Sequence, residues 1–228
     1  MIKWIILSAS VILLAIAGLA LPKTAASAPA LDAMPATVKI VHTWRITTTQ
    51  AVYKATGASL GTVIAPKIIL THNHFGSTLD RQPSGALVVM DKANHAWRGQ
   101  ATDTHLIAIN AGTSLIELPN DLPVPAVPLA DDADLQRLTV GRWVTVDYWD
   151  DHTQHIAQRD FQIIKVQVDV ARLADPDRAI QLGDSGGGAY FSGKLVGNIW
   201  SIDVDSAGRP AGSFNIALLP AQVLSYVK

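Results

Sequence analysis

The stretch QLGDSGGGAY, from Gln181 to Tyr190, places four glycines and one serine around an aspartate, between two strand-like stretches. Glycine loses more backbone entropy on folding than any other residue, so such a cluster indicates a backbone that turns sharply or closely approaches another group. Two interpretations follow. The stretch is either a flexible turn, or it exposes Ser185 as a nucleophile whose neighbouring backbone N–H groups point into a site.

Length, charge and cysteine content limit the protein class. A chain of 228 residues can form one two-lobed domain or two small ones with a sizeable core. Its 18 Lys and Arg balance 19 Asp and Glu without a basic stripe, which argues against a nucleic-acid-binding protein. The absence of cysteine excludes disulfides, cysteine nucleophiles and thiolate metal sites.

The N-terminus has the pattern of a targeting segment. Lys3 precedes an apolar run from Trp4 to Leu21, and Ala26-Ser27-Ala28 resembles a cleavage site. The run is also long enough for a minimal membrane span. We therefore expect a signal peptide or membrane anchor over 1–28, a linker over 29–37 and an exported domain over 38–228. The domain would be secreted or otherwise extracytoplasmic, free or attached to the membrane through residues 4–21.

Short apolar or alternating runs recur from Thr37 onward, with many β-branched residues and few helix-like windows. This pattern predicts an all-β fold of the sandwich or barrel type. A proline-rich stretch at 120–134 cannot be a central strand and divides the chain into halves of similar strand content. We expect two six-stranded antiparallel β-barrels, at about 38–128 and 139–218, and a short C-terminal helix that begins at Pro220.

The order of residues along the chain limits the kind of serine site. All seven histidines precede Ser185, whereas an α/β-hydrolase needs a helix and then a histidine after its serine. The order acid, histidine, serine would leave Asp32 as the only acid before His72 or His74. That order also belongs to a fold with helices between parallel strands, so we reject it. The order histidine, acid, serine stays open, and it belongs to a two-barrel all-β architecture.

Two motifs in that order resemble one family. LTHNH, residues 70–74, resembles the L-T-x-x-H segment of the trypsin-like (chymotrypsin-fold) serine proteases, and GDSGG, residues 183–187, resembles their serine segment. SLGTVIAPKIILT, residues 59–71, is similar to their strand pair before the histidine. The resemblance covers about Val38 to Lys228 and is to the disulfide-free bacterial type. It implies that His74 is the general base and Ser185 the nucleophile.

The chemistry of such a site accounts for the residue types. A serine hydroxyl is a weak nucleophile unless a base takes its proton. Backbone N–H groups of Gly183 and Ser185 would form an oxyanion hole, and Asp184 would hold the turn through an internal partner. The family resemblance further implies that Ala179, six residues before the nucleophile, would lie at the base of the substrate pocket and favour a small or medium apolar side chain. Nothing in the sequence implies a cofactor.

The resemblance fails where the family has its acid. The family strand D-[IL]-A-L-L-x-L corresponds to GTSLIEL, so Gly112 stands at the aspartate position. Asn110 and Asp103 are the nearest substitutes. The segment VGNIWSID also places Trp200 where the family often has a small hydroxyl residue that supports the acid.

Other histidines allow a metal alternative. On an extended chain His72 and His74 would face the same side and could bind a metal, with His152 or His155 as a third ligand. The sequence around the latter pair, WDDHTQH, favours a solvated hairpin tip. His42, His95 and His105 have nothing around them to distinguish them from ordinary histidines, so we predict no metal site.

Two functions remain. The first is an exported serine endopeptidase that cuts a peptide or protein substrate through His74 and Ser185. The alternative is a non-catalytic, protease-like module that binds peptides or a protein partner in the cleft between the barrels. The presence of both His74 and the complete Gly-Asp-Ser-Gly-Gly favours the enzyme, because a binder needs neither.

Overall fold

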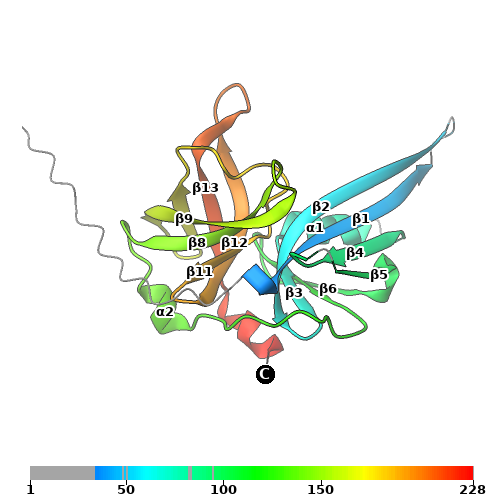
Figure 1. Cartoon of the computed structure of the whole chain (residues 1–228), viewed down its shortest axis with the longest axis horizontal. Coiled ribbons are helices and arrows are strands. Elements are labelled where there is room, and N and C mark those ends of the chain that lie inside the picture. Colours follow the sequence, from blue (N-terminus) through cyan, green and yellow to red (C-terminus); the bar gives the residue numbers. More distant parts are fainter. Residues whose placement is uncertain (1–33, 48, 50, 82–83, 94, 228) are drawn as a thin grey trace, which may run out of the picture.

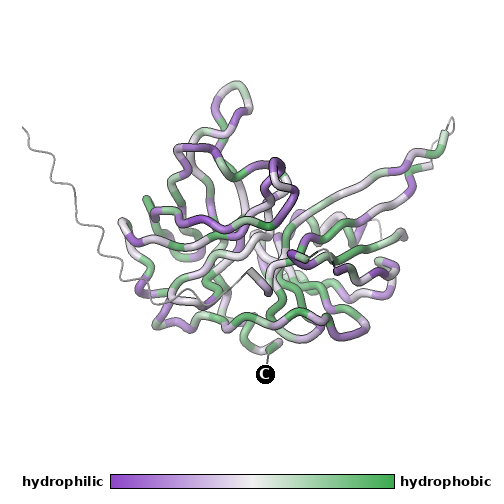
Figure 2. The backbone as a smooth tube through the Cα atoms, viewed as in Figure 1, coloured by the Kyte–Doolittle hydropathy of each residue, from purple (hydrophilic) through white to green (hydrophobic). Residues whose placement is uncertain are grey.

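The computed structural model describes residues 34–227 except 48, 50, 82, 83 and 94. The chain forms two β lobes that lie side by side, with the C-terminal segment beneath them (Figure 1). Hydrophobic residues concentrate along the strands inside both lobes, whereas hydrophilic residues mark most of the connecting loops (Figure 2). The expected all-β, two-lobed fold is confirmed.

The first lobe is a seven-stranded antiparallel sheet in the order β5-β4-β1-β2-β3-β7-β6. Its strands are β1 (Thr37–Thr47), β2 (Val52–Ala65), β3 (Ile68–Thr71), β4 (Ala86–Met90), β5 (Ala96–Gln100), β6 (His105–Ala108) and β7 (Ser114–Glu117). The sheet curls, but its edge strands β5 and β6 do not pair with each other. In place of the predicted six-stranded barrel, this lobe is a curled, open half-barrel with one strand more than predicted. The additional strand is β5, whose sequence AWRGQ lacks an apolar alternation.

The second lobe is a closed barrel in the order β10-β13-β12-β11-β8-β9. Its strands are β8 (Trp143–Asp150), β9 (His155–Val166), β10 (Val170–Ala174), β11 (Gly188–Phe191), β12 (Lys194–Val204) and β13 (Pro210–Leu218). Inward side chains such as Val146, Ile163 and Phe214 are fully buried in its core. This barrel has the predicted six strands.

Helices are few and short. Helix α1 (Asn73–Arg81) follows β3, α2 (Asp132–Gln136) lies in the connection between the lobes, and the short 3₁₀ helices are η1 (Met34–Ala36), η2 (Ala101–Asp103) and η3 (Ala221–Tyr226). The C-terminal helix predicted after Pro220 is η3, whose Val223 is buried in a cluster with Leu115 of the first lobe and Leu195 of the second. This apolar cluster joins the two lobes.

Strands β1 and β2 form a hairpin that extends beyond its lobe (Figure 1). Their register is continuous from the pair Thr37 and Thr62 to the pair Thr47 and Val52. Strand β4 covers the outer edge of β1 only as far as Thr43, and β3 begins to pair with β2 only at Thr62. The outer part of the hairpin thus has no further strand beside it in the described chain.

Within the described ranges, no helix is long and apolar enough to cross a membrane. The apolar run at 4–21, and with it the predicted signal or anchor, lies outside the described residues.

Candidate active site

The glycines around Ser185 are required by the backbone. Gly183 has φ +110° and Gly186 has φ +90°, conformations that residues with a Cβ rarely adopt. A Cβ on Gly186 would also lie 2.1 Å from the carbonyl oxygen of Leu60 and 2.5 Å from Oγ1 of Thr71. The glycine-rich stretch is thus a defined turn pressed against the first lobe.

Asp184 fixes this turn from inside. Its carboxylate is buried and accepts the backbone N–H groups of Trp149 and Gln181, each at 2.7 Å. Burial raises the pKa of Asp184 to about 6, against the opposing effect of the two N–H donors. The predicted internal partner of Asp184 is therefore confirmed, and it consists of backbone amides.

Ser185 is held by its carbonyl group. This oxygen accepts a hydrogen bond from the N–H of Leu60 at 3.0 Å and another from the hydroxyl of Ser59 at 2.8 Å. Ser59 is 126 positions away from Ser185 in the sequence. Within the described chain, the N–H groups of Gly183 and Ser185 have no acceptor. Two backbone donors beside the half-buried serine are thus left without acceptors in the described residues.

The histidine segment meets the serine turn through Thr71. Strand β3 ends at Thr71, whose hydroxyl donates to the Leu60 carbonyl at 2.7 Å, and Leu60 in turn binds Ser185. Helix α1 then begins at Asn73, whose side-chain oxygen accepts the hydroxyl of Ser114 at 3.0 Å. These contacts place the start of α1, and with it His74, at the junction of the lobes.

His74 and Ser185 are not hydrogen-bonded to each other. The His74 side chain is exposed, and neither its ring nitrogens nor Oγ of Ser185 bond to any residue that the structure describes. Catalytic hydrogen bonds are often long or misaligned before substrate binds, so this geometry is compatible with a catalytic pair.

His72 lies beside His74 in a different environment. Their rings meet edge to face with centroids 5.5 Å apart, and His72 is buried. Burial, and then the charge of His74, lower the pKa of His72 to about 4, so its imidazole is neutral at pH 7. The expectation that both rings face the same side of an extended chain was wrong, because His74 belongs to helix α1.

The metal alternative finds no support in the described residues. They contain no group of three or more His, Asp or Glu side chains that could hold a metal ion. His152 is exposed in the tight connection from β8 to β9, and His155 is exposed at the start of β9. The predicted hairpin tip is confirmed.

Gly112, at the position of the family's acid, lies in a filled space. It is buried, and a Cβ there would be 2.6 Å from Cβ of Ala217 and 3.4 Å from the ring of Trp200. The side-chain amide of Asn198 donates to the Gly112 carbonyl at 3.0 Å. Trp200 thus lies beside Gly112, as the sequence register predicts, and Cβ of Ala217 lies too close to leave room for the Cβ of an aspartate.

The two substitute residues are engaged in local turns. Oδ1 of Asn110 accepts the N–H groups of Gly112 and Thr113 at 2.8 and 2.9 Å. Asp103, in η2, accepts the N–H of Gln100 at 3.0 Å. Neither side chain bonds to His74.

Ala179 belongs to a segment that a second buried aspartate holds. The N–H groups of Ala179 and Ile180 donate to the two carboxylate oxygens of Asp175, each at 2.9 Å. Ala179 itself is half-buried against the core of the second barrel. Asp175 and Asp184 thus fix the chain on both sides of the Leu182 to Gly183 turn.

Contacts between the lobes behind the serine turn were missed by sequence reasoning. The hydroxyl of Thr37 on β1 donates to the Asp147 carboxylate on β8 and lies 2.9 Å from the hydroxyl of Tyr190 on β11. Nearby, Nζ of Lys39 lies 3.2 Å from the ring centroid of Trp149. No sequence motif marks these residues, because only the packing of the lobes brings them together.

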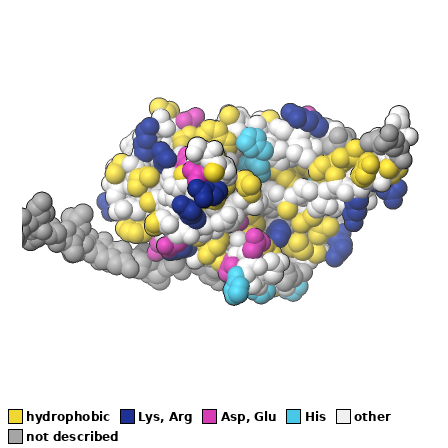
Figure 3. All heavy atoms as spheres, turned by 90° about the horizontal axis from the view of Figure 1, so that it is seen from above, with side chains coloured by type: hydrophobic (Ala, Val, Ile, Leu, Met, Phe, Trp, Pro, Cys, Tyr) yellow, Lys and Arg dark blue, Asp and Glu magenta, His cyan; other side chains and the backbone are white. Residues whose placement is uncertain are grey.

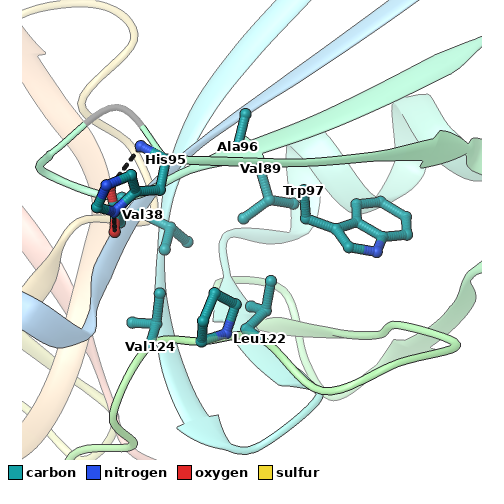
Figure 4. Close-up of a pocket in the computed structure, with 9 residues that line it drawn as sticks. Val38, Val89, His95, Ala96, Trp97, Leu122 and Val124 are labelled. Carbon is teal, nitrogen blue, oxygen red and sulfur yellow. Dashed lines mark hydrogen bonds and ion pairs between the residues drawn. The ribbon is translucent and has the colours of Figure 1, made fainter.

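A small apolar cavity of about 140 Å³ lies elsewhere, in the first lobe (Figure 4). Val38, Val89, Trp97 and Val124 line it, and Nδ1 of His95 at its rim lies 3.1 Å from the Asp91 carboxylate. None of its lining residues is a candidate active-site residue.

Comparisons with known proteins give the fold. No protein-family model matches this sequence, and no curated protein sequence matches it either. Three solved structures are similar: an inactivated protease paralogue of the scabies mite, HL collagenase, and the HtrA-type protease AlgW with a decapeptide.

The mite paralogue shares 13% identity over 85% of this chain and 93% of its own, with a TM-score of 0.63. The collagenase shares 16% identity over 86% of this chain and 95% of its own, with a TM-score of 0.63. AlgW shares 16% identity over 84% of this chain and 62% of its own, with a TM-score of 0.61. At these identities the likeness concerns the fold alone: the chain has the double-barrel fold of the chymotrypsin-like serine proteases.

Proposed function

We propose that this protein is a serine endopeptidase, in which Ser185 is the nucleophile, His74 the general base, and the N–H groups of Gly183 and Ser185 the oxyanion hole. One observation carries the proposal. The serine turn is fixed at Asp184 and at the Ser185 carbonyl, while its two backbone donors are left without acceptors in the described chain. A preorganised pair of donors stabilises the charge that develops on a carbonyl oxygen.

The reaction would proceed through a serine ester. Oγ of Ser185 bonds to the substrate carbonyl carbon while its proton passes to His74, and the peptide C–N bond breaks as His74 returns that proton to the leaving amine. Water then attacks the ester carbon while His74 takes its proton, and the C–O bond to Ser185 breaks as His74 gives that proton to Oγ, which releases the acid product. Because the His74 ring is exposed and Gly112 offers no carboxylate, a solvent water would have to bond the second ring nitrogen.

We further propose that Ala179 limits the substrate pocket to small or medium apolar side chains, and that the domain works outside the cytoplasm after export through its N-terminal segment. The substrate would be a peptide or protein. AlgW, whose structure holds a decapeptide, supports peptide binding by this fold.

A second function, binding without cleavage, has specific support. Ala217 and Trp200 fill the space beside Gly112, and an inactivated protease paralogue is among the similar structures. In that case the cleft would hold a peptide or protein partner, and Ser185 would be chemically inert.

Incubation with a denatured protein mixture tests the proposal, with new peptide ends identified by mass spectrometry. We expect cleavage after small or medium apolar residues by the wild-type protein and none by Ser185→Ala. Equal cleavage by both proteins would contradict the proposal, and so would no cleavage by either. Peptides retained equally by both proteins without cleavage would establish the binding function.

A further inference from the structure

The outer part of the β1–β2 hairpin has an unpaired edge that starts at Ser185. The N–H of Leu60 points away from β1 and donates to the Ser185 carbonyl at 3.0 Å. Successive residues of a strand point their backbone groups to opposite edges, so those of Ala58, Thr56 and Lys54 point the same way as those of Leu60. In the described chain the N–H and C=O groups of these three residues have no partner on that edge.

One face of the hairpin is apolar. Directly opposite residues in an antiparallel pair share a face, and the register pairs Trp44 with Ala55 and Ile46 with Tyr53. Ile46 is 44% exposed and Tyr53 54% exposed. A Cβ on Gly57 would lie 3.5 Å from the Trp44 ring and 4.0 Å from the Phe75 ring of α1, so the apolar face reaches back to the helix that carries His74.

The other face carries two cations, among threonines and the exposed Val52. The register places Arg45 opposite Lys54, both exposed, and neither forms an ion pair with a residue that the structure describes. The sequence has no Asp or Glu between Asp32 and Asp80. Like charges directly opposite each other destabilise a strand pair. A lysine can protect an edge strand against unwanted pairing, which would explain Lys54. It does not explain Arg45, which lies opposite Lys54 on β1. Figure 3 shows hydrophobic side chains along the outer part of the β1–β2 hairpin, with Lys and Arg side chains beside them.

We propose that the edge of β2 from Lys54 to Ala58 binds an extended polypeptide by strand addition, with apolar and acidic side chains alternating along the bound segment. The apolar side chains of the bound segment would lie over Tyr53 and Ala55. Its acidic side chains would lie beside Lys54, which has Arg45 opposite it on β1. This inference rests on the proposed function and deepens it, since the bound segment would be the part of the substrate on one side of the bond at Ser185. Backbone pairing supplies affinity in strand addition, and alternate side chains supply specificity.

A lipid surface fits the same cations and aromatic rings less well. Backbone N–H and C=O groups without partners are costly in a lipid environment, and this edge presents several of them. An extended peptide satisfies these groups, the apolar face and the cations together.

The test uses full-length Ser185→Ala and fluorescent peptides, with binding followed by anisotropy. A peptide of alternating Val and Glu should bind, and the double reversal Arg45→Glu/Lys54→Glu should weaken its binding at least about tenfold while favouring a Val and Lys peptide. The matched control Arg142→Glu/Lys165→Glu makes the same change of charge at exposed residues of the second lobe and should have no effect.

N-methylated peptides test the strand pairing. An added strand uses every second amide, so methylation of one alternate set should abolish binding and methylation of the other should leave it. Equal binding of both methylated peptides, or equal weakening by the control reversal, would overturn the proposal. Two further results would also overturn it: competition by phosphatidylserine vesicles but not by unlabelled peptide, or a dimer that masks the edge in sedimentation.

Failure of this inference is distinguishable from failure of the proposed function. If a serine-directed probe labels the wild-type protein and the hairpin reversal does not affect peptide binding, only the strand addition is wrong. If the probe fails to label while the peptide binds as described, the strand addition holds and the endopeptidase does not.

Discussion

The serine turn and the histidine segment differ in how completely the described residues fix them. Asp184 and the Ser185 carbonyl each accept two hydrogen bonds between 2.7 and 3.0 Å, which fix the serine turn. Across the junction, His74 is exposed, and its ring bonds to no residue in the described part of the chain. The difference indicates that the fold itself holds the serine turn, whereas no described residue orients the His74 ring.

The largest expected effect concerns the pair itself. Ser185→Ala and His74→Ala should each lower kcat/KM for peptide cleavage by about a thousandfold or more. The double variant should be no worse than either single one, because the two residues act as a unit. Steady-state kinetics on one peptide would measure this, and additive losses would show that the histidine side does not work through the serine.

The buried Asp184 and His72 should have opposite effects on the pH dependence of stability. The pKa of Asp184 is raised to about 6, so its contribution is present below about pH 4 and lost as pH rises through 6. The pKa of His72 is lowered to about 4, so the unfolded chain binds more protons between pH 4 and 6.5 and stability rises with pH there. Each contribution is roughly 3 kcal/mol, so they largely cancel in the wild-type protein.

Single substitutions should separate these contributions. For Asp184→Asn we expect the free energy of unfolding to rise from pH 4 to 6.5, and for His72→Asn to fall over pH 4 to 6. Urea unfolding at several pH values measures both slopes. Slopes of the same sign would contradict the assignment. His72→Asn should keep most of the cleavage activity, because His72 is neutral and His74 is the base.

Gly112→Asp should not supply the missing carboxylate partner for His74. The new Cβ would lie 2.6 Å from Cβ of Ala217, so we expect a loss of about 1 to 3 kcal/mol in stability and no gain in activity. The double variant Gly112→Asp/Ala217→Gly should regain part of that loss in thermal unfolding. A single variant as stable as the wild-type protein would show that Gly112 is not confined.

The smallest effect is expected at the substrate pocket. Ala179→Val should reduce kcat/KM about tenfold for the larger of two apolar substrates, since a methylene or two in a pocket changes discrimination by that order. The rate of labelling of Ser185 by a small serine probe should not change. A change in labelling with no change in substrate preference would place Ala179 in the serine turn rather than in the pocket.

The sequence predicted the features that depend on local pattern. The short apolar runs predicted the two-lobed β fold, and the glycines around Ser185 predicted a sharp turn. The segment WDDHTQH predicted a hairpin tip. Strand β5 was missed, because Arg98, Gly99 and Gln100 have no apolar alternation. The burial of His72 beside an exposed His74 was also missed, since it depends on where helix α1 begins. The filling of the space at Gly112 depends on Ala217 and Trp200, more than 80 residues away, which no local pattern reveals.

The most direct test of a His74-activated serine is the rate at which a fluorophosphonate probe labels Ser185. Mass spectrometry of tryptic peptides would locate the adduct, and His155→Ala would serve as a control at an exposed histidine at the start of β9. We predict labelling of Ser185 in the wild-type protein and in His155→Ala, and its loss in His74→Ala. An unlabelled wild-type protein, or labelling that survives His74→Ala unchanged, would contradict the account.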